Sequence, residues 1–277
     1  MIFDNEDSGN TPRAKKRFGQ HFLIDRNVIN RIIKTADLSE SDHVVEVGPG
    51  LGALTEGLVE SGASVTAVEV DTDLAEVLKE KFKGAGNFEI IIKDALKFSF
   101  DDFAVEKGRK LKLVSNLPYN ISGPILAKFL SERSAFTLMV LMFQKEVAER
   151  IAAGPGTKDY GILSVFSQMF TDVRLEFHVS RNLFTPRPKV ESSVVSFKVL
   201  DTPRYEITNE AFFKTVVKSA FGTRRKTLLN ALKALGLEKE IILQGLNKAE
   251  IDPQRRGETL TGAEFSRLAN ILFLLKA

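Results

Sequence analysis

Four residues, Asn116-Leu117-Pro118-Tyr119, directly follow an apolar run, "LKLVS", that is typical of a β-strand. The side-chain oxygen of Asn116 and the main-chain carbonyl of Leu117 are hydrogen-bond acceptors, and Pro118 stiffens the turn that holds them. Two acceptors aimed at the N–H bonds of an adenine amino group would make its nitrogen more nucleophilic. Tyr119 can stack on a base taken out of its helix. Taken alone, the segment is also compatible with an ordinary strand-to-helix turn.

A glycine-rich turn, "VVEVGPGLGALT", joins an earlier strand-like run to a helix through Gly48, Gly50 and Gly52. Without side chains, this backbone can approach a nucleotide-type ligand closely. Glu69 ends the next expected strand, where a carboxylate can accept hydrogen bonds from both hydroxyls of a ribose, and Asp94 ends the strand after that. The spacing also fits the G-x-G-x-x-G/A form of a dinucleotide fold, so the glycines alone leave NAD open.

Two acidic features favour S-adenosyl-L-methionine over NAD as the cofactor. Glu46 precedes the turn in an E-x-G-x-G-x-G pattern, and a carboxylate ends each of the next two strands. S-adenosylmethionine is cationic near its reactive methyl group and has no pyrophosphate to neutralise, so an acidic pocket suits it better than NAD.

Side chains that act as strong bases, nucleophiles or metal ligands are not grouped in this sequence. The chain has no cysteine, and its three histidines, His21, His43 and His178, have no metal-site spacing. We therefore expect no metal and a mechanism based on positioning and electrostatics, in which the methylated nitrogen loses its proton to solvent.

Short β-rich runs alternate with helical periodicity between residues 43 and 143. This rhythm predicts an α/β fold with a mostly parallel sheet covered on both faces. The expected parallel strands are residues 43–47, 64–70, 88–94, 111–116 and 136–143. Two further runs, 172–179 and 192–200, flank a Pro-rich loop and predict an antiparallel hairpin that closes the sheet.

Helical periodicity alone follows residue 202, most clearly in residues 210–221, 226–236 and 262–275. We therefore expect three parts in this chain. They are a flexible basic tail (1–17), a domain built on the mostly parallel sheet (18–202) and a smaller helical domain (203–277).

The composition of the 277-residue chain indicates a soluble globular protein, because 43% of its residues are hydrophobic. The absence of cysteine, of a long apolar run and of a basic secretory start predicts a cytoplasmic protein without membrane contact. Residues 36–106 hold 16 Asp/Glu against 5 Lys/Arg, whereas residues 13–17 and 211–236 are strongly basic. Two basic segments on either side of an acidic segment favour a polyanionic partner, and nucleic acid is the first candidate.

Eight motifs in order give the chain its resemblance to the ribosomal RNA adenine N6-dimethyltransferase family, most closely to its small-subunit branch. They are "RFGQHFL", "VEVGPGLGALT", Glu69, Asp94, "NLPYNIS", "FQKEVAERI", "FTPRPKVESSVV" and "FGTRRKTLLNAL". The resemblance implies that residues 18–202 are a methyltransferase domain with a Rossmann-like class I sheet and S-adenosylmethionine as donor, and that the helical domain 203–277 binds RNA. It also implies dimethylation of two adjacent adenines in the 3′-terminal stem-loop of 16S rRNA, within an immature 30S-type particle, by a monomer.

The resemblance also assigns roles to individual residues. His21, Leu23, Gly48, Gly50, Glu69, Asp94 and Asn116 would contact the cofactor, and Asn116, Leu117, Pro118 and Tyr119 would form the catalytic segment. His21 stands where the family often has asparagine, although a neutral imidazole can still make one hydrogen bond. The expected RNA-binding residues are Arg224, Arg225, Lys226, Arg187 and Lys189. The alternative for Arg224, Arg225 and Lys226 is that they are solvent-exposed charges of an amphipathic helix without a role in RNA binding.

Two other functions stay open at this point. One is a large-subunit (23S) rRNA adenine dimethylase of the antibiotic-resistance type, which has similar motifs. The other is a ribosome assembly or RNA-binding factor with secondary catalysis. An NAD-dependent dehydrogenase is a more distant third possibility.

Overall fold

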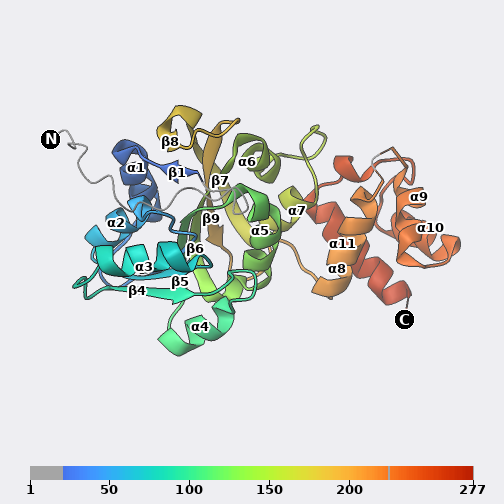
Figure 1. Cartoon of the computed structure of the whole chain (residues 1–277). Helices are drawn as coiled ribbons and strands as arrows, with labels where there is room; N and C mark the ends of the chain where they lie inside the picture. Colours follow the sequence, from blue (N-terminus) through green and yellow to red (C-terminus); the bar gives the residue numbers. More distant parts are fainter. Residues whose placement is uncertain (1–20, 224, 277) are drawn as a thin grey trace.

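The structure, a computed structural model, describes residues 21–223 and 225–276 (Figure 1). The expected basic tail, residues 1–17, lies outside the described residues, as does Arg224. A large sheet with its helices forms one half, and the last helices form the other, to the right in Figure 1. Among the described residues, no helix is both long and apolar enough to cross a membrane.

Seven strands form the large sheet, in the order β4-β3-β2-β5-β6-β9-β7. Their bounds are β2 (His43–Val47), β3 (Ser64–Glu69), β4 (Phe88–Ile92), β5 (Leu111–Asn116), β6 (Phe136–Gln144), β7 (Thr171–Val179) and β9 (Ser192–Val199). Strands β2 to β6 pair in parallel, and β9 runs antiparallel between β6 and β7. The predicted α/β class, the parallel strands and the closing hairpin are therefore confirmed.

The strands β2, β5 and β6 are mostly buried because helices cover both of their faces. On one face, α1 (Arg26–Ala36) and α2 (Ala53–Glu60) pack on alternate residues such as Val44 and Val114. On the other face, apolar residues of α4 (Phe100–Lys107) and α5 (Ser122–Ser131) share a cluster with Val45 and Leu113, and α7 (Ile162–Phe170) packs on α5 and β7. Helices α3 (Thr72–Lys81) and α6 (Lys145–Ala152) complete this half.

The chain after β9 forms the helices α8 (Glu210–Phe221), α9 (Leu228–Leu232), α10 (Lys239–Lys248) and α11 (Gly262–Leu275). The expected helix 226–236 is shorter than predicted, because Thr227 has an extended backbone at its start. The last turn before Gly236 is a 3-10 turn, Lys233–Leu235. Strand β9 ends at Val199 and α8 begins at Glu210, and the domain boundary near residue 202 stays a prediction.

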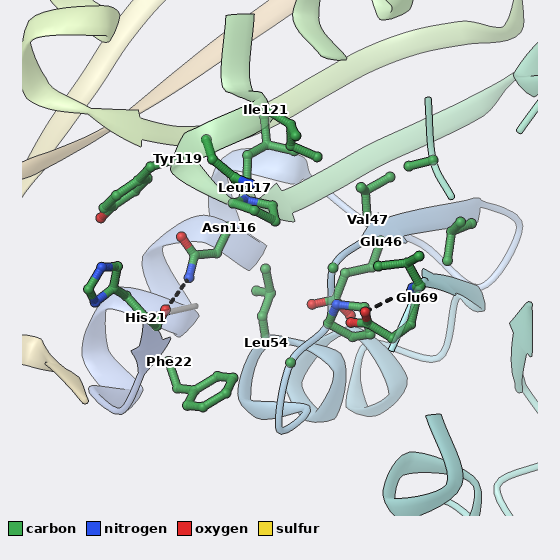
Figure 2. Close-up of a pocket in the computed structure, with 18 of the residues that line it drawn as sticks. His21, Phe22, Glu46, Val47, Leu54, Glu69, Asn116, Leu117, Tyr119 and Ile121 are labelled. Carbon is green, nitrogen blue, oxygen red and sulfur yellow. Dashed lines mark hydrogen bonds between the residues drawn. The ribbon is translucent and has the colours of Figure 1, made fainter. Parts of the chain in front are cut away.

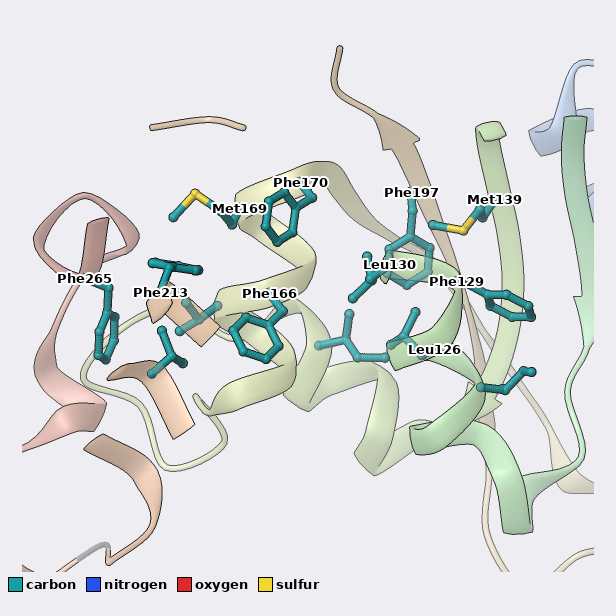
Figure 3. Packing of buried hydrophobic residues seen from close by; sticks show 14 of the residues in the cluster. Leu126, Phe129, Leu130, Met139, Phe166, Met169, Phe170, Phe197, Phe213 and Phe265 are labelled. Carbon is teal, nitrogen blue, oxygen red and sulfur yellow. The ribbon is translucent and has the colours of Figure 1, made fainter. Parts of the chain in front are cut away.

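A continuous apolar cluster joins the two halves (Figure 3). Phe166 and Met169 of α7 lie between the sheet side, where Phe129 and Phe197 are buried, and Phe213 of α8. The rings of Phe166 and Phe213 are 6.2 Å apart. The helical half thus shares its core with the helices that cover the sheet.

A second sheet of two short strands was not predicted from the sequence. Strand β1 (Phe22–Leu23) pairs antiparallel with β8 (Phe184–Thr185), and the amide of Ile24 donates to the carbonyl of Leu183 at 3.0 Å. This pairing fixes the start of the described chain beside the carboxyl end of β5, where the amide of Asn116 reaches the carbonyl of His21.

Candidate active site

A cavity of about 260 Å³ opens at the carboxyl ends of the parallel strands (Figure 2). Its walls come from the ends of β2 and β3, the segments after β4 and β5, and the residues 21–23. Carboxyl ends of neighbouring parallel strands meet at one edge of a sheet, which is where open α/β folds bind ligands. Ten predicted residues line the cavity: His21, Leu23, Gly48, Gly50, Glu69, Asp94, Asn116, Leu117, Pro118 and Tyr119.

The glycine turn brings bare backbone to the cavity wall. Gly48 and Gly50 have φ angles of 67° and 61°, which L side chains rarely adopt. A Cβ atom on Gly48 would lie 3.2 Å from the ring of Pro118, and one on Gly50 would lie 2.8 Å from the ring of Phe22. The two glycines are therefore favoured both by their backbone conformation and by the close approach of Pro118 to Gly48 and of Phe22 to Gly50.

Glu69 is held at the end of β3 by the backbone that follows it. Its Oε1 accepts hydrogen bonds from the amides of Val70 at 2.8 Å and Asp71 at 2.9 Å. The residue is only 5% exposed, and this burial raises the pKa of its carboxyl group, although the amides of Asp71 and Val70 oppose the rise. A buried, oriented carboxylate at this edge matches the chemistry of paired ribose hydroxyls.

Asp94 lies two residues beyond β4, in a turn that its own side chain stabilises. Its Oδ1 accepts a hydrogen bond from the amide of Leu96 at 2.9 Å. Lys93, Ala95 and Leu96 also line the cavity, so this end is partly apolar. The turn offers a hydrogen-bonding carboxylate next to an apolar surface, a combination suited to the edge and face of a purine.

Asn116 is oriented by a contact that no sequence pattern indicates. Its Nδ2 donates to the main-chain carbonyl of His21 at 3.2 Å (Figure 2). The amide nitrogen therefore faces residue 21, and the amide oxygen points away from it, toward Tyr119. This leaves an acceptor directed to the place where a flipped base would meet the catalytic segment.

Tyr119 is held in a fixed orientation at the cavity edge. Its hydroxyl lies 2.6 Å from the hydroxyl oxygen of Ser192 at the start of β9. The imidazole ring of His21 lies 5.5 Å from the Tyr119 ring, at an angle of 30°, and donates from Nδ1 to the carbonyl of Pro186 at 2.7 Å. Burial raises the pKa of the Tyr119 hydroxyl, so the phenol is neutral and offers its ring for stacking.

In the expected catalytic segment, the side chains of Leu117 and Pro118 pack against other parts of the protein. The Leu117 side chain is only 1% exposed and packs in the main core, so only its backbone can act on a ligand. Pro118 packs over Gly48 and precedes a single 3-10 turn, Tyr119–Ile121, which leads into α5.

Glu46 is the most deeply buried acid of the cavity. It is 1% exposed, and its Oε2 accepts a hydrogen bond from the hydroxyl of Thr55 on α2 at 2.6 Å. Burial raises the pKa of Glu46 to about 8, and the negative field of Glu69 adds to this effect. The sequence pattern had marked Glu46 only as part of the glycine motif.

The predicted RNA-binding residues that the structure describes do not line the cavity. Arg187 and Lys189 are exposed in the segment between β8 and β9, and Arg187 directly follows Pro186, whose carbonyl accepts the hydrogen bond from His21. Arg225 and Lys226 lie between α8 and α9, in the other half of the molecule (Figure 1). The structure therefore separates the basic residues into two groups.

Ser192 and Thr55, the hydrogen-bond partners of Tyr119 and Glu46, were not predicted from the sequence. Both are fully buried hydroxyls, Ser192 on Tyr119 and Thr55 on Glu46. Their partners are 73 and 9 residues away in the chain. Single serines and threonines in apolar runs give no signal of such pairing. Among the described residues, no group of three His, Cys, Asp or Glu side chains could hold a metal ion.

Comparisons with known proteins agree with this geometry. Residues 11–273 match the family model described as ribosomal RNA adenine dimethylase. The chain is 51% identical over 272 residues to the ribosomal RNA small subunit methyltransferase A of Pelotomaculum thermopropionicum, covering 95% of this chain and 92% of that one.

Two solved structures resemble the whole chain. A dimethyladenosine transferase from Plasmodium falciparum has a TM-score of 0.76 at 28% identity, and covers 90% of this chain and 96% of its own. The 23S rRNA methyltransferase ErmE has a TM-score of 0.69 at 27% identity, and covers 91% of this chain and 99% of its own.

Proposed function

Because the chain belongs to the ribosomal RNA adenine dimethylase family, we propose that it methylates N6 of two adjacent adenines in the 3′-terminal stem-loop of 16S rRNA. The product is N6,N6-dimethyladenine, made during late assembly of the small subunit. High identity to a small-subunit methyltransferase over nearly the full chain supports this substrate over 23S rRNA. The observation that carries the proposal is one cavity bordered by both the glycine turn with Glu69 and the segment Asn116–Tyr119.

The lining residues fit S-adenosylmethionine. Glu69 would hold the ribose, Asp94 would bind the amino group of the cofactor's adenine, and the backbone at Gly48 and Gly50 would lie against the cofactor. His21, Leu23 and Asn116 complete the lining on the side of the catalytic segment. When bound, the cofactor supplies an electrophilic methyl group on a positively charged sulfur.

The catalytic segment acts on the target adenine by positioning. The oxygen of Asn116 and the carbonyl of Leu117 accept hydrogen bonds from the amino group, and this favours a pyramidal nitrogen whose lone pair points at the methyl group. Pro118 restricts the turn, and the ring of Tyr119 stacks on the flipped base. The methylated nitrogen is an acidic ammonium group and loses its proton to solvent.

The second methylation uses a different arrangement of the same groups. After the first transfer, the amine has one N–H left, so only one of the two acceptors can be used as before. The methyl group must then rotate out of the line of attack, into space beside Tyr119. Ile121 also lines the cavity. We therefore expect that replacing Ile121 with a larger side chain slows the second transfer more than the first.

Two basic groups are the proposed RNA contacts. Arg187 and Lys189 would bind phosphates next to the flipped adenine, and Arg225 and Lys226, with Arg224, would bind a more distant part of the RNA in the immature 30S-type particle. We expect a cytoplasmic monomer. Exchanging either pair for alanine should weaken RNA binding, and every phosphate that is no longer neutralised should reduce the slope of log affinity against log salt by about 0.7–0.9.

Mass spectrometry of rRNA after incubation with the protein and S-adenosylmethionine tests the proposed function. Small-subunit particles and naked 23S rRNA should be incubated side by side. Two dimethyladenines in the 3′-terminal 16S stem-loop are the expected product. Dimethyladenine found only in 23S rRNA would support a large-subunit dimethylase of the antibiotic-resistance type. RNA binding without any methylation would support an assembly factor.

A further inference from the structure

Glu46 is a buried acid that borders a ligand cavity, and among the described residues its one side-chain hydrogen bond comes from Thr55. Glu46 is the penultimate residue of β2 and pairs with Ala67 of the adjacent strand β3, two residues before Glu69, which lines the same cavity. A charged carboxylate that is withdrawn from water is costly unless a cation or several donors compensate it. One hydroxyl donor is weak compensation, so the neutral acid is favoured while the cavity holds no cation.

The charged groups around Glu46 reinforce this preference. Glu69 is the nearest acid and disfavours a second negative charge. Lys81, on α3, is the cation whose field acts on Glu46, but its amino group pairs with Glu56 at 3.6 Å instead. Burial accordingly raises the pKa of Glu46 to about 8, so the acid is mostly protonated at neutral pH.

The two forms of the proposed cofactor differ by one positive charge. S-adenosylmethionine has a sulfonium cation, which S-adenosylhomocysteine, the product of methyl transfer, lacks. A cation in the same cavity would stabilise ionised Glu46, whereas the neutral thioether would not. Both ligands share the amino and carboxylate groups of the methionine part, but the sulfonium lowers the pKa of the donor's amino group. The titration of each free ligand is therefore measured separately and subtracted in a comparison of the two.

We propose that Glu46 lets the cavity distinguish the methyl donor from its product, because Glu46 releases a proton when the cationic donor binds and regains it when the neutral product replaces the donor. This inference rests on the proposed function, since it requires S-adenosylmethionine as the donor. It gives the enzyme a physical reason to release the product, whose binding gains nothing from the ionised acid.

Binding measurements at several pH values give the first test. Because Glu46 must lose a proton for tight donor binding, the ratio of the donor's Kd to the product's Kd should fall by about tenfold for each unit of pH rise below pH 8. Above pH 8, the ratio should become constant. A ratio that stays constant from pH 6 to 9 would overturn the proposal.

Calorimetry counts the protons directly. Titrations in buffers of different ionisation enthalpy at pH 7 should show release of up to about 0.9 more protons for S-adenosylmethionine than for S-adenosylhomocysteine. In Glu46→Gln, whose side-chain oxygen can still accept from Thr55, this difference should vanish. Equal proton counts in the wild type, or a difference that persists in Glu46→Gln, would contradict the proposal.

Two further variants separate this role from a merely structural one. Glu60→Gln removes an exposed carboxylate on the same helix as Thr55, one that pairs with Arg26 and not with Lys81, and should keep the wild-type proton count. Thr55→Val removes the hydrogen bond that favours ionised Glu46, so the pH at which the Kd ratio becomes constant should rise. A fall in that pH would contradict the proposal, even if Glu46→Gln does not fold. If neither ligand binds the wild type, the proposed cofactor itself is wrong, and this inference is wrong with it.

Discussion

Asn116 is the residue whose side-chain amide is oriented, by its hydrogen bond to the carbonyl of His21, to accept from the target amine. Asn116→Ala removes an acceptor for the target amine, so we expect the rate of methyl transfer to fall by about 10²–10³-fold. Binding of S-adenosylhomocysteine should change only a few fold, because the glycine turn, Glu69 and Asp94 are untouched. Single-turnover transfer and calorimetric binding measure the two effects, with the exposed Asn247→Ala on α10 as the control. Near wild-type dimethylation by Asn116→Ala would contradict the proposed mechanism.

The pair Tyr119 and Ser192 separates stacking from positioning. Tyr119→Ala should lose about 1–3 kcal/mol of base stacking, seen in kcat/KM for RNA. Tyr119→Phe keeps the ring and loses only the hydrogen bond to Ser192, so its loss should be about tenfold or less. Ser192→Ala should cost about the same, and the double variant should cost no more than either single variant. Fully additive losses would show that the hydroxyl pair does not act as a unit.

The candidate residues could be found from the sequence because they follow strand ends at fixed spacings. The orientation of Asn116 could not, because it depends on the carbonyl of His21, which is 95 residues away in the chain. The raised pKa of Glu46 was also hidden, since it depends on burial by elements that only the fold brings together. A pattern shows which groups occur at an edge, but the protonation state depends on their surroundings.

At the level of elements, the sequence predicted the strands because most are short runs rich in β-branched and other apolar residues, whereas β7 alternates polar and apolar residues. Small differences occur at the ends, where the expected strand 88–94 ends at Ile92 and leaves Asp94 in a turn. The two-residue strands β1 and β8 have no periodicity of their own, and they form because they pair with each other across the chain. Several helix N-termini, in contrast, follow recognisable capping residues such as Asp25 and Thr261.

The start of α11 provides a stability test at this level. Thr261 and Glu264 form a capping box, and Arg255 donates to both carboxylate oxygens of Glu264. Burial raises the pKa of Glu264, but these hydrogen bonds outweigh it and lower the pKa to about 2. The ionised acid therefore stabilises the fold fully above its ordinary pKa of 4.5, and this contribution is lost as the pH falls toward 2.

Glu264→Gln should accordingly lower the free energy of unfolding by about 1 kcal/mol at pH 7. The difference from the wild type should shrink as the pH falls from about 5 to 3. Urea titrations at a series of pH values measure this difference. Glu240→Gln, an exposed acid in the first turn of α10, controls for the helix dipole and should change stability little. A difference between Glu264→Gln and the wild type that is independent of pH would contradict the role of the charge.

At the level of the whole molecule, the sequence indicated a change of character near residue 202 but not how closely the two parts pack. The apolar cluster runs from Phe129 and Phe197 through α7 to Phe213 without interruption. Polar contacts cross the same junction, because Arg133 donates to both carboxylate oxygens of Glu210 at 3.1 and 2.7 Å. Periodicity reports which face of a helix is apolar, but not which other helix covers that face.

This shared core predicts that the two halves unfold together. Phe213→Ala leaves a cavity beside Phe166 and should lower the free energy of unfolding by about 3–5 kcal/mol. Since the cluster is continuous, amides of β5 and β6 should exchange with solvent at the same reduced opening free energy as those of α8. Phe273→Ala, at a half-buried position on α11, should cost much less. Faster exchange confined to α8 and the helices after it would show instead that the helical half opens independently of the sheet.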